Sequence, residues 1–367
     1  MPFHRPSASV GRSRAGGEVV KVLVTGGAGF VGSHIVEHLL DGGADVRVLD
    51  RLDPADLDQR AELISGDLAD ERVVRTAVQG VDAVCHQAAK VGLGVSFADV
   101  DGYVADNDVG TAMLLKALWT RSFRGRLVLA SSMVVYGEGP ARCPEHGRFA
   151  PAPRQAHDLA LGRWDPPCPV DACDAALTWE LVDEDTPTDP RNVYAATKLH
   201  QEHLCALWAR ESTASVVALR YHNVYGPRMP RDTPYAGVAA VFRSALSNGQ
   251  SARVFEDGGQ ARDFVHVADV AVANGLALTA AHADPVVFNV ASGAPRTVYQ
   301  LAVSLARAFG RDPDSVEVTG EWRLGDVRHI VASPQRAAER LGFTAAVGFD
   351  AGMDEFASVA QPATASR

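Results

Sequence analysis

Tyr194 and Lys198, in the run Tyr194-Ala-Ala-Thr-Lys198, are the residues of this chain best suited to proton transfer. Their spacing puts both side chains on one face of a helix, where residues at i and i+4 are neighbours. A phenol with its usual pKa near ~10 is a poor base at neutral pH, and a lysine cation beside it favours the phenolate and lowers that pKa. An isolated Tyr-x-x-x-Lys can equally be a solvated helix face, so other features must decide.

A glycine-rich turn follows the first apolar segment. Residues 20–24 have the pattern of a buried strand, and Gly26, Gly29 and Gly32 follow with the spacing Gly-x-x-Gly-x-x-Gly. Such glycines let the backbone turn tightly, approach a pyrophosphate and aim helix N–H groups at its charge. A helical segment and a second strand over 45–50 come next, in the order of a dinucleotide-binding fingerprint. The pattern predicts a dinucleotide site.

Asp50 ends that second strand, about where a carboxylate accepts hydrogen bonds from an adenosine ribose. Its charge would repel the additional phosphate of NADP, whereas the adjacent Arg51 would attract it. NAD is therefore the expected cofactor, and NADP stays open at this point.

Two hydroxyls, Ser131 and Ser132, end another apolar strand that begins near residue 126. Open parallel sheets bind their ligands at the carboxyl ends of strands. A Ser-Ser pair there is often simple turn chemistry. Together with Tyr194 and Lys198, however, it completes a hydroxyl, phenol and amine set, and this combination predicts catalysis.

With these motifs the chain resembles the extended short-chain dehydrogenase/reductase family, specifically its nucleotide-sugar epimerases and dehydratases, over roughly residues 20–355. Further landmarks in family order are Gly66-Asp67-Leu68, His86-Gln-Ala-Ala89, Asn107-Asp-Val-Gly-Thr111, the run 219–228, Arg262-Asp-Phe-Val-His266 and the run 323–328. The resemblance implies an α/β fold: a Rossmann-type doubly wound parallel sheet with a smaller C-terminal substrate-binding domain.

By this resemblance Tyr194 would be the base that takes a proton from a sugar hydroxyl while hydride leaves the same carbon for the nicotinamide. Lys198 would lower the pKa of the tyrosine and hold the nicotinamide ribose, and Ser132 would hydrogen-bond the sugar oxygen. His86 and His266 are expected to serve structure.

The resemblance also implies which residues would bind the cofactor and which would bind the nucleotide sugar. The cofactor would contact Gly26, Gly29, Phe30, Val31, Gly32, Asp50, Asp67, Leu68 and Lys198, with Asp67 at the adenine. The nucleotide sugar would contact Ser132, Asn223, Val254, Phe255, Arg262 and Arg323. In this assignment Asn223 meets the sugar diphosphate, the two arginines neutralise its charge, and Val254 and Phe255 lie near the base.

Met133 and Val134, directly after Ser132, bear on the reaction. Family members that dehydrate resemble one another in having Asp-Glu there, and apolar side chains cannot transfer protons. Dehydration is therefore disfavoured, and oxidation followed by reduction at sugar carbon 4 remains. The run 221–228 and a long insertion resemble dTDP-L-rhamnose 4-epimerases, which implies a dTDP-6-deoxyhexose substrate.

Two other functions stay open. An NAD(P)H-dependent nucleotide-sugar 4-ketoreductase needs the same three catalytic groups, and retention of bound NAD through turnover would separate the two enzymes. A non-catalytic dinucleotide-binding protein is disfavoured, because such a relative would be expected to lose the tyrosine or the lysine.

The segment between the catalytic serine and tyrosine is more than twice as long as the family usually has. This insertion, 138–180, carries Cys143-Pro-Glu-His146 and Cys168-Pro-Val-Asp-Ala-Cys173. Two close ligand pairs resemble a structural zinc site with three thiolates and one imidazole. The alternative is a surface loop with unconnected thiols.

Composition limits the partners. The chain has 367 residues, 47% hydrophobic content and a net charge of −10, which argues against bulk nucleic-acid binding. The sequence contains no run of about eighteen apolar residues, so it predicts no membrane span. The polar residues 1–18 lack the apolar segment of a secretory signal, and five cysteines, an odd number, favour a reducing cytoplasm.

The expected organisation is a loose tail over 1–18, an NAD-binding domain over 19–220, a mainly substrate-binding part over 221–357 with 263–290 returning to the sheet, and a loose tail over 358–367. Further strands are expected near 83–86, 215–220 and 286–290, and helices near 31–41, 71–79, 104–121 and 193–210. The resemblance also implies a homodimer built on the last two helices.

Overall fold

The structure is a computed structural model that describes residues 19–52, 57–92, 97–230, 237–281 and 285–358. Its centre is a seven-stranded, all-parallel sheet with the strand order β13-β9-β5-β4-β1-β2-β3. The strands are β1 Lys21–Thr25, β2 Asp45–Asp50, β3 Glu62–Ser65, β4 Ala83–His86, β5 Arg126–Ser132, β9 Ser215–Tyr221 and β13 Val286–Val290. The predicted Rossmann-type sheet is confirmed.

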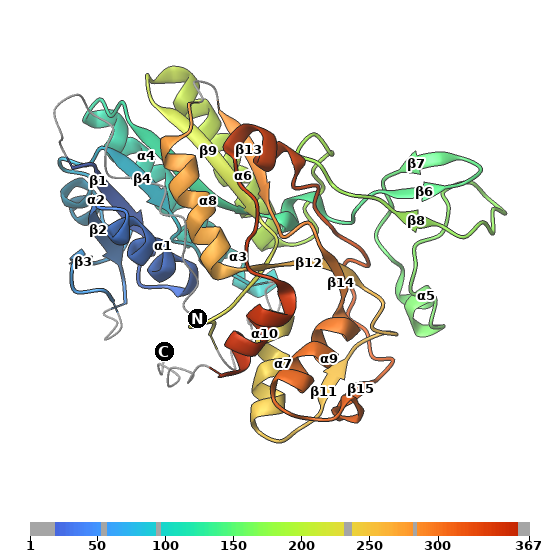
Figure 1. Ribbon diagram of the computed structural model, residues 1–367. Helices are drawn as coiled ribbons and strands as arrows, with labels where there is room; N and C mark the ends of the chain where they lie inside the picture. Colours follow the sequence, from blue (N-terminus) through green and yellow to red (C-terminus); the bar gives the residue numbers. More distant parts are fainter. Residues whose placement is uncertain (1–18, 53–56, 93–96, 231–236, 282–284, 359–367) are drawn as a thin grey trace.

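Helices cover both faces of this sheet (Figure 1). The helices are α1 Phe30–Asp41 and α8 Val267–Thr279 on one face, and α2 Glu71–Ala77, α4 Gly110–Thr120 and α6 Val193–Glu211 on the other. Side chains alternate along a strand, so Val22 and Val24 pack in the core with α1 and α8, whereas Leu23 packs in the core with the opposite helices. Both faces of the sheet are therefore buried.

Two features of this part differ from the sequence expectation. The edge strand β3 was not predicted, because its four residues are only partly buried and show no apolar run. The helix expected over 104–121 begins earlier, as α3 Val100–Tyr103, passes through a π-helical turn, η2 Val104–Val109, and continues as α4. Short 3-10 turns lie at η1 Phe97–Asp99 and η3 Met133–Tyr136.

A smaller C-terminal lobe has its own apolar core. It contains the sheet β10-β12-β14 (Asn223–Tyr225, Ala261–His266, Pro295–Thr297), the pair β11-β15 (Ala252–Val254, Val316–Val318), and the helical segments α7 Val238–Ser247, α9 Val298–Ala308, η4 Pro313–Ser315 and α10 Phe349–Ser358. The π-helical segment η5 Ala337–Leu341 instead packs against α8 and β13, in the core of the large sheet. The return to the large sheet consists of α8 and β13. Residues 263–266, which were expected to return with them, belong to β12 in the small sheet instead.

The insertion 138–180 projects away from both parts as a separate protrusion (Figure 1). It forms a small antiparallel sheet with the order β7-β6-β8 (Gly147–Phe149, Ala141–Cys143, Thr178–Trp179) and one short helix, α5 Ala156–Ala160. Among the helices of the described residues, none has the length and apolar character to cross a membrane.

Candidate active site

Ser132, Tyr194 and Lys198 meet at the carboxyl end of β5. The side chain of Asn192 accepts a hydrogen bond from the N–H of Ala195 (2.9 Å), which caps α6 and puts Tyr194 in its first turn. The Ser132 hydroxyl hydrogen-bonds the Tyr194 phenol. Lys198 Nζ lies 6.0 Å from the centroid of the tyrosine ring and donates to the carbonyl of Ala130 in β5 (2.9 Å).

The electrostatics of this pair differ from the sequence expectation. Burial raises the pKa of Tyr194 to about 12, against a lowering influence of the Ser132 hydrogen bond, and the nearby Tyr103 raises it further. Lys198 is only 3% exposed, and burial lowers its pKa to about 8. The lysine was expected to lower the pKa of the tyrosine, but its ammonium is directed to the Ala130 carbonyl, and burial of the phenol dominates.

Asn107, in the π-helical turn, holds the start of α6 in place. Its side-chain amide donates to Thr197 Oγ1 (2.9 Å) and to the carbonyl of Lys90 (3.1 Å), and its oxygen accepts from the N–H of Lys90 (2.7 Å). The side chain of Gln201, one turn after Lys198, donates to the carbonyl of Asn107 (3.1 Å). This π turn therefore positions the helix that carries Tyr194 and Lys198. The sequence did not indicate this role for Asn107.

His86 serves structure. Its Nδ1 is 2.7 Å from Thr25 Oγ1 and its Nε2 is 2.9 Å from Thr111 Oγ1. The Thr111 hydroxyl donates its one proton to the carbonyl of Asn107 (2.6 Å), so His86 Nε2 must be the donor. Burial, with a contribution from the charge of Lys198, lowers the pKa of His86 to about 3. The ring stays neutral and joins β1, β4 and α4.

A buried ion pair ties α6 to the sheet. Arg220 of β9 binds Glu202 of α6 with Nε–Oε1 and Nη2–Oε2 distances of 2.9 and 2.7 Å. Ser131, the residue before the candidate catalytic serine, also donates to Glu202. The strand that carries Ser132 and the helix that carries Tyr194 are thus joined at Glu202, two helical turns after Tyr194. This contact fixes the position of α6 relative to β5.

The glycine turn between β1 and α1 has the geometry of a phosphate cradle. Gly26 has φ +68°, and a Cβ on it would lie 2.6 Å from the backbone nitrogen of Ala88. A Cβ on Gly32 would lie 2.0 Å from the carbonyl oxygen of Gly26, so helix and turn pack closely there. No side chain caps α1, which leaves the N–H groups of Phe30 and Val31 for an anion.

Asp50 borders this cradle. Its carboxylate accepts from the N–H groups of Ala28 (2.9 Å) and Leu52 (3.0 Å) and keeps acceptor capacity for a ribose hydroxyl. Arg51 pairs with Asp106 (3.1 Å) and lies 3.4 Å from Asp67, so its charge is balanced within the protein.

Two further residues expected at the cofactor follow the carboxyl end of β3, at the edge of the sheet where Asp50 ends β2. Asp67 accepts from the N–H of Ala69 (2.8 Å), and Leu68 is buried against Gly110 of α4. The loop that carries both begins at Gly66, whose N–H donates to the carbonyl of Asp50 (2.8 Å) at the end of the neighbouring strand β2.

Arg262 and Asn223 lie on neighbouring parallel strands, β12 and β10. The Arg262 guanidinium donates to the carbonyls of Ala261 (2.9 Å), Arg328 (2.9 Å) and Val327 (2.6 Å). No carboxylate of the described residues lies within salt-bridge distance of it, and Glu138, Asp326 and Glu256 act on its charge from farther away. The Oδ1 of Asn223 is buried with no partner in the described part of the chain. The Arg262 guanidinium can donate to the oxygens of a diphosphate, whereas the Asn223 Oδ1 is an acceptor and would need a donor.

Phe255 and Arg323, far apart in sequence, are adjacent in the C-terminal lobe. The Arg323 guanidinium lies 5.0 Å from the centroid of the Phe255 ring, and Val254 before it is buried. Sequence reasoning missed the ion-pair network beside them: Arg154 of the insertion binds Glu256 (2.8 Å), and Arg328 binds Glu256 (3.1 Å) and Asp257 (2.7 Å). Pairs more than seventy residues apart leave no local sequence signal.

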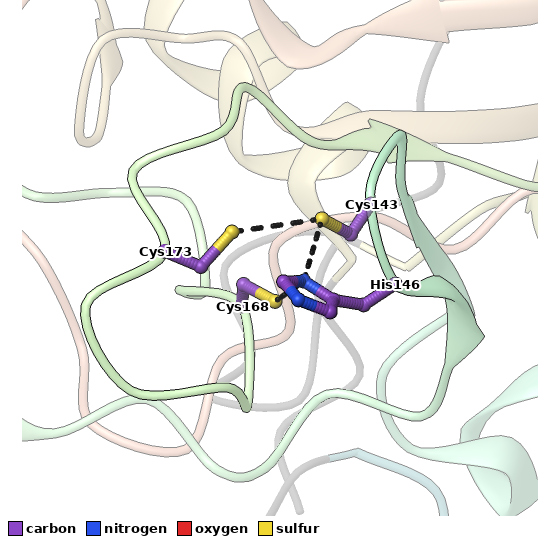
Figure 2. A group of neighbouring side chains, drawn as sticks. All are labelled: Cys143, His146, Cys168 and Cys173. Carbon is purple, nitrogen blue, oxygen red and sulfur yellow. Dashed lines mark hydrogen bonds between the residues drawn. The ribbon is translucent and has the colours of Figure 1, made fainter.

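The four candidate metal ligands converge within the insertion (Figure 2). Their ligand atoms all lie within 4.8 Å of one another. Cys143 Sγ is 3.5 Å from His146 Nδ1 and 3.7 Å from Cys173 Sγ, and Cys168 Sγ is 3.5 Å from His146 Nδ1. None of the five cysteines of the chain forms a disulfide.

Comparison with known proteins agrees with this geometry. Residues 22–160 and 176–291 match the NAD dependent epimerase/dehydratase family, and the chain belongs to that family. The expected resemblance and the assignment to NAD-dependent nucleotide-sugar epimerase/dehydratase enzymes are thereby confirmed. The unmatched residues 161–175 fall inside the insertion.

Similar proteins include the dTDP-L-rhamnose 4-epimerase of Burkholderia thailandensis, 30% identical over 91% of this chain and 93% of that protein. Among solved structures, Thermus thermophilus UDP-glucose 4-epimerase in complex with NAD is 31% identical, covers 92% of this chain and 98% of its own, and has a TM-score of 0.74. Thermotoga maritima UDP-glucose 4-epimerase with UDP-glucose is 28% identical, with 92% and 97% covered and a TM-score of 0.75.

Proposed function

We propose that this chain is a nucleotide-sugar 4-epimerase, which oxidises sugar carbon 4 transiently and reduces it again from the opposite face. Tyr194 exchanges the proton of the sugar hydroxyl, Ser132 hydrogen-bonds the same oxygen, and Lys198 holds the cofactor ribose. When bound, NAD supplies the acceptance and return of the hydrogen with its electron pair. The proximity of the three side chains at the end of β5 supports this assignment.

The observation that carries the choice of reaction is the apolar pair Met133-Val134 after Ser132. Met133 packs against an apolar cluster that includes Val135 and Ile330. The next carboxylate along the chain, Glu138, accepts the N–H groups of the segment 328–329 at 2.8 and 2.6 Å and is thereby occupied. A dehydratase needs an acid and a base beside the sugar, whereas an epimerase needs only the proton exchange that Tyr194 offers.

The proposed substrate is a dTDP-6-deoxyhexose of the dTDP-L-rhamnose type, supported by the similarity to the Burkholderia enzyme. In this proposal Asn223 and Arg262 contact the diphosphate, while Phe255 and Arg323 lie at the nucleotide base. The guanidinium of Arg262, which backbone carbonyls hold in place, supports its part. For Asn223, the side-chain amide N–H would be the donor to a diphosphate oxygen.

The test is a panel of dTDP-, UDP- and GDP-sugars incubated with the purified full-length chain, with products separated by chromatography. We expect dTDP-L-rhamnose to give a single epimeric product without added cofactor and without net change in nicotinamide absorbance. Stoichiometric consumption of NADH or NADPH would replace the proposal with a 4-ketoreductase. Loss of water from the sugar would replace it with a dehydratase.

Cofactor choice gives a separate prediction. NAD should bind at least about tenfold more tightly than NADP, roughly 1.4 kcal/mol, because Asp50 repels the extra phosphate and the charge of Arg51 is balanced by Asp106 and Asp67. Titration of both cofactors into protein stripped of nucleotide measures the ratio. Equal affinities would contradict this role of Asp50.

We also propose a homodimer built on the helical segments α3–α4 and α6, in the cytoplasm. Four exposed apolar side chains on these segments support the interface: Val104, Val109, Trp119 and Leu207. Five unpaired cysteines support a reducing compartment. Light scattering on wild type and on Leu207→Glu measures the assembly, and a monomeric wild type would contradict it.

A further inference from the structure

Three of the six distances between the ligand atoms of the insertion match those of a tetrahedral metal site, and all six are within 4.8 Å. With Zn–S of about 2.3 Å and Zn–N of about 2.0 Å, tetrahedral angles place two sulfurs about 3.8 Å apart and a sulfur and a nitrogen about 3.5 Å apart. The observed distances are 3.7 Å for Cys143–Cys173 and 3.5 Å for both sulfur–His146 contacts. A disulfide would require about 2.05 Å. The thiols are therefore spaced to surround an ion.

We propose that the insertion binds one structural Zn²⁺ through Cys143, His146, Cys168 and Cys173, and that this ion holds the insertion against the C-terminal lobe. Three thiolates and one imidazole favour zinc over magnesium or calcium, which prefer oxygen ligands. Four protein ligands complete the tetrahedron and leave no position for substrate, so the ion acts on structure and not in the reaction.

The backbone around the cluster supports thiolates. The N–H groups of Glu145 and His146 donate hydrogen bonds to Cys143 Sγ, and the N–H of Ala175 donates to Cys173 Sγ. Such second contacts orient metal ligands and stabilise their charge. They arise locally, because Cys143 and Gly147 are register partners at the end of the β6–β7 hairpin and Gly147 has φ +80°. The first ligand pair is therefore formed by one tight turn.

The insertion has little apolar core of its own. Within 138–180, all of which the structure describes, the fully buried hydrophobic side chains are Ala141, Leu159 and two of the ligands, Cys143 and Cys168. So few apolar contacts cannot offset the entropy of ordering about forty residues. A metal cross-link between the hairpin and the distant Cys168–Cys173 loop would supply the missing stability.

The segment between the two ligand pairs reaches the C-terminal lobe. Arg154 donates to the carboxylate of Glu256 (2.8 Å) and to the carbonyl of Asp326 (2.7 Å), and Arg328 Nε donates to Asp165 (2.8 Å). Glu256 directly follows Phe255. If the proposed function is correct, the zinc therefore fixes a clamp at the nucleotide end of the substrate site.

Metal content of the full-length protein, purified without added metal, tests the ion directly. We expect about one equivalent of zinc by elemental analysis, and strong sulfur-to-metal absorption after replacement by cobalt. His146→Ala changes an exposed ligand and should lose most of the zinc while the chain folds. The buried thiol variant Cys205→Ala, outside the cluster, should keep it. Wild-type protein that neither contains zinc nor binds cobalt overturns the proposal.

The clamp is tested by limited proteolysis and substrate kinetics on the same variants. His146→Ala should be cleaved within 138–180 much faster than Cys205→Ala, and its KM for the nucleotide sugar should rise more than its kcat falls. Unchanged proteolysis with zinc lost would overturn the holding role. Inactivity of wild type on every nucleotide sugar would contradict the proposed function and leave the metal and proteolysis results standing.

Discussion

The candidate active site and the insertion contain similar numbers of functional side chains, yet they are held by opposite means. Ser132, Tyr194 and Lys198 sit on β5 and α6, between two large apolar clusters that bury both faces of the sheet. The Cys143–Cys173 cluster sits in a protrusion with almost no apolar core (Figure 1). The core of the fold positions the active-site side chains. In the insertion, the proposed metal ligands themselves hold the chain segments together.

This difference predicts which property a substitution in each region should change. A change at the active site should alter chemistry and leave the fold intact, because the core and the Arg220–Glu202 pair position the backbone independently of the phenol. A change in the metal cluster should alter the fold of the insertion and leave the chemistry intact.

The largest effect is expected for Tyr194→Phe. The variant keeps the ring and removes only the hydroxyl that exchanges the proton, so turnover should fall by about 10²–10⁴-fold. NAD binding and the midpoint of thermal unfolding should stay near those of wild type. Steady-state kinetics with calorimetry measures both. Near-normal turnover would mean that another group exchanges the proton.

Lys198→Met should reveal the cost of burying the ammonium. Burial lowers the pKa of Lys198 from 10.5 to about 8, so between these pH values the unfolded chain binds the proton more strongly than the folded one. Wild-type stability relative to the variant should therefore rise with pH across this window, by up to about 3 kcal/mol. Denaturant unfolding of both proteins at several pH values measures the difference. A flat or falling difference would contradict the burial argument.

The sequence predicted the active-site half of the contrast well. The alternation of apolar strand segments with helical segments and the glycine spacing indicated the sheet, and the Tyr194–Lys198 spacing put the pair on one helix face. It could not predict the direction of the Tyr194 pKa, since that depends on burial and on Tyr103, which arrives from another helix. It also could not predict the contacts of Arg154 and Arg328, because ion pairs between distant segments have no periodic signature.

The insertion was predicted less completely. The ligand spacing identified Cys143, His146, Cys168 and Cys173 as a group, and the structure brings them together. The three strands β6, β7 and β8 escaped prediction, because two or three residues are too few to show alternation. Strands this short form only when neighbouring strands pair with them. In the insertion, the proposed metal cross-link would hold those neighbours together.

A smaller effect is expected at the substrate end. Arg262→Gln keeps a hydrogen-bonding head on a shorter stem and removes the guanidinium charge, so KM for a nucleotide sugar should rise about tenfold, roughly 1.4 kcal/mol. The kcat should change less, because the diphosphate is bound equally before and during the reaction. Kinetics at low and moderate salt measures the change. An unchanged KM would remove Arg262 from the diphosphate site.

The smallest effect on kcat is expected for substitutions at two helix caps. Asn192 caps α6, which carries Tyr194, and Asp70 caps α2, on the same face of the sheet but away from the site. Replacing either with Ala should cost about 1 kcal/mol of unfolding free energy. Only Asn192→Ala should also lower kcat, by a few-fold, because fraying of the first turn of α6 moves the phenol relative to Ser132. Equal kcat values in the two variants would show that the Arg220–Glu202 pair and Asn107 position Tyr194 without help from the cap.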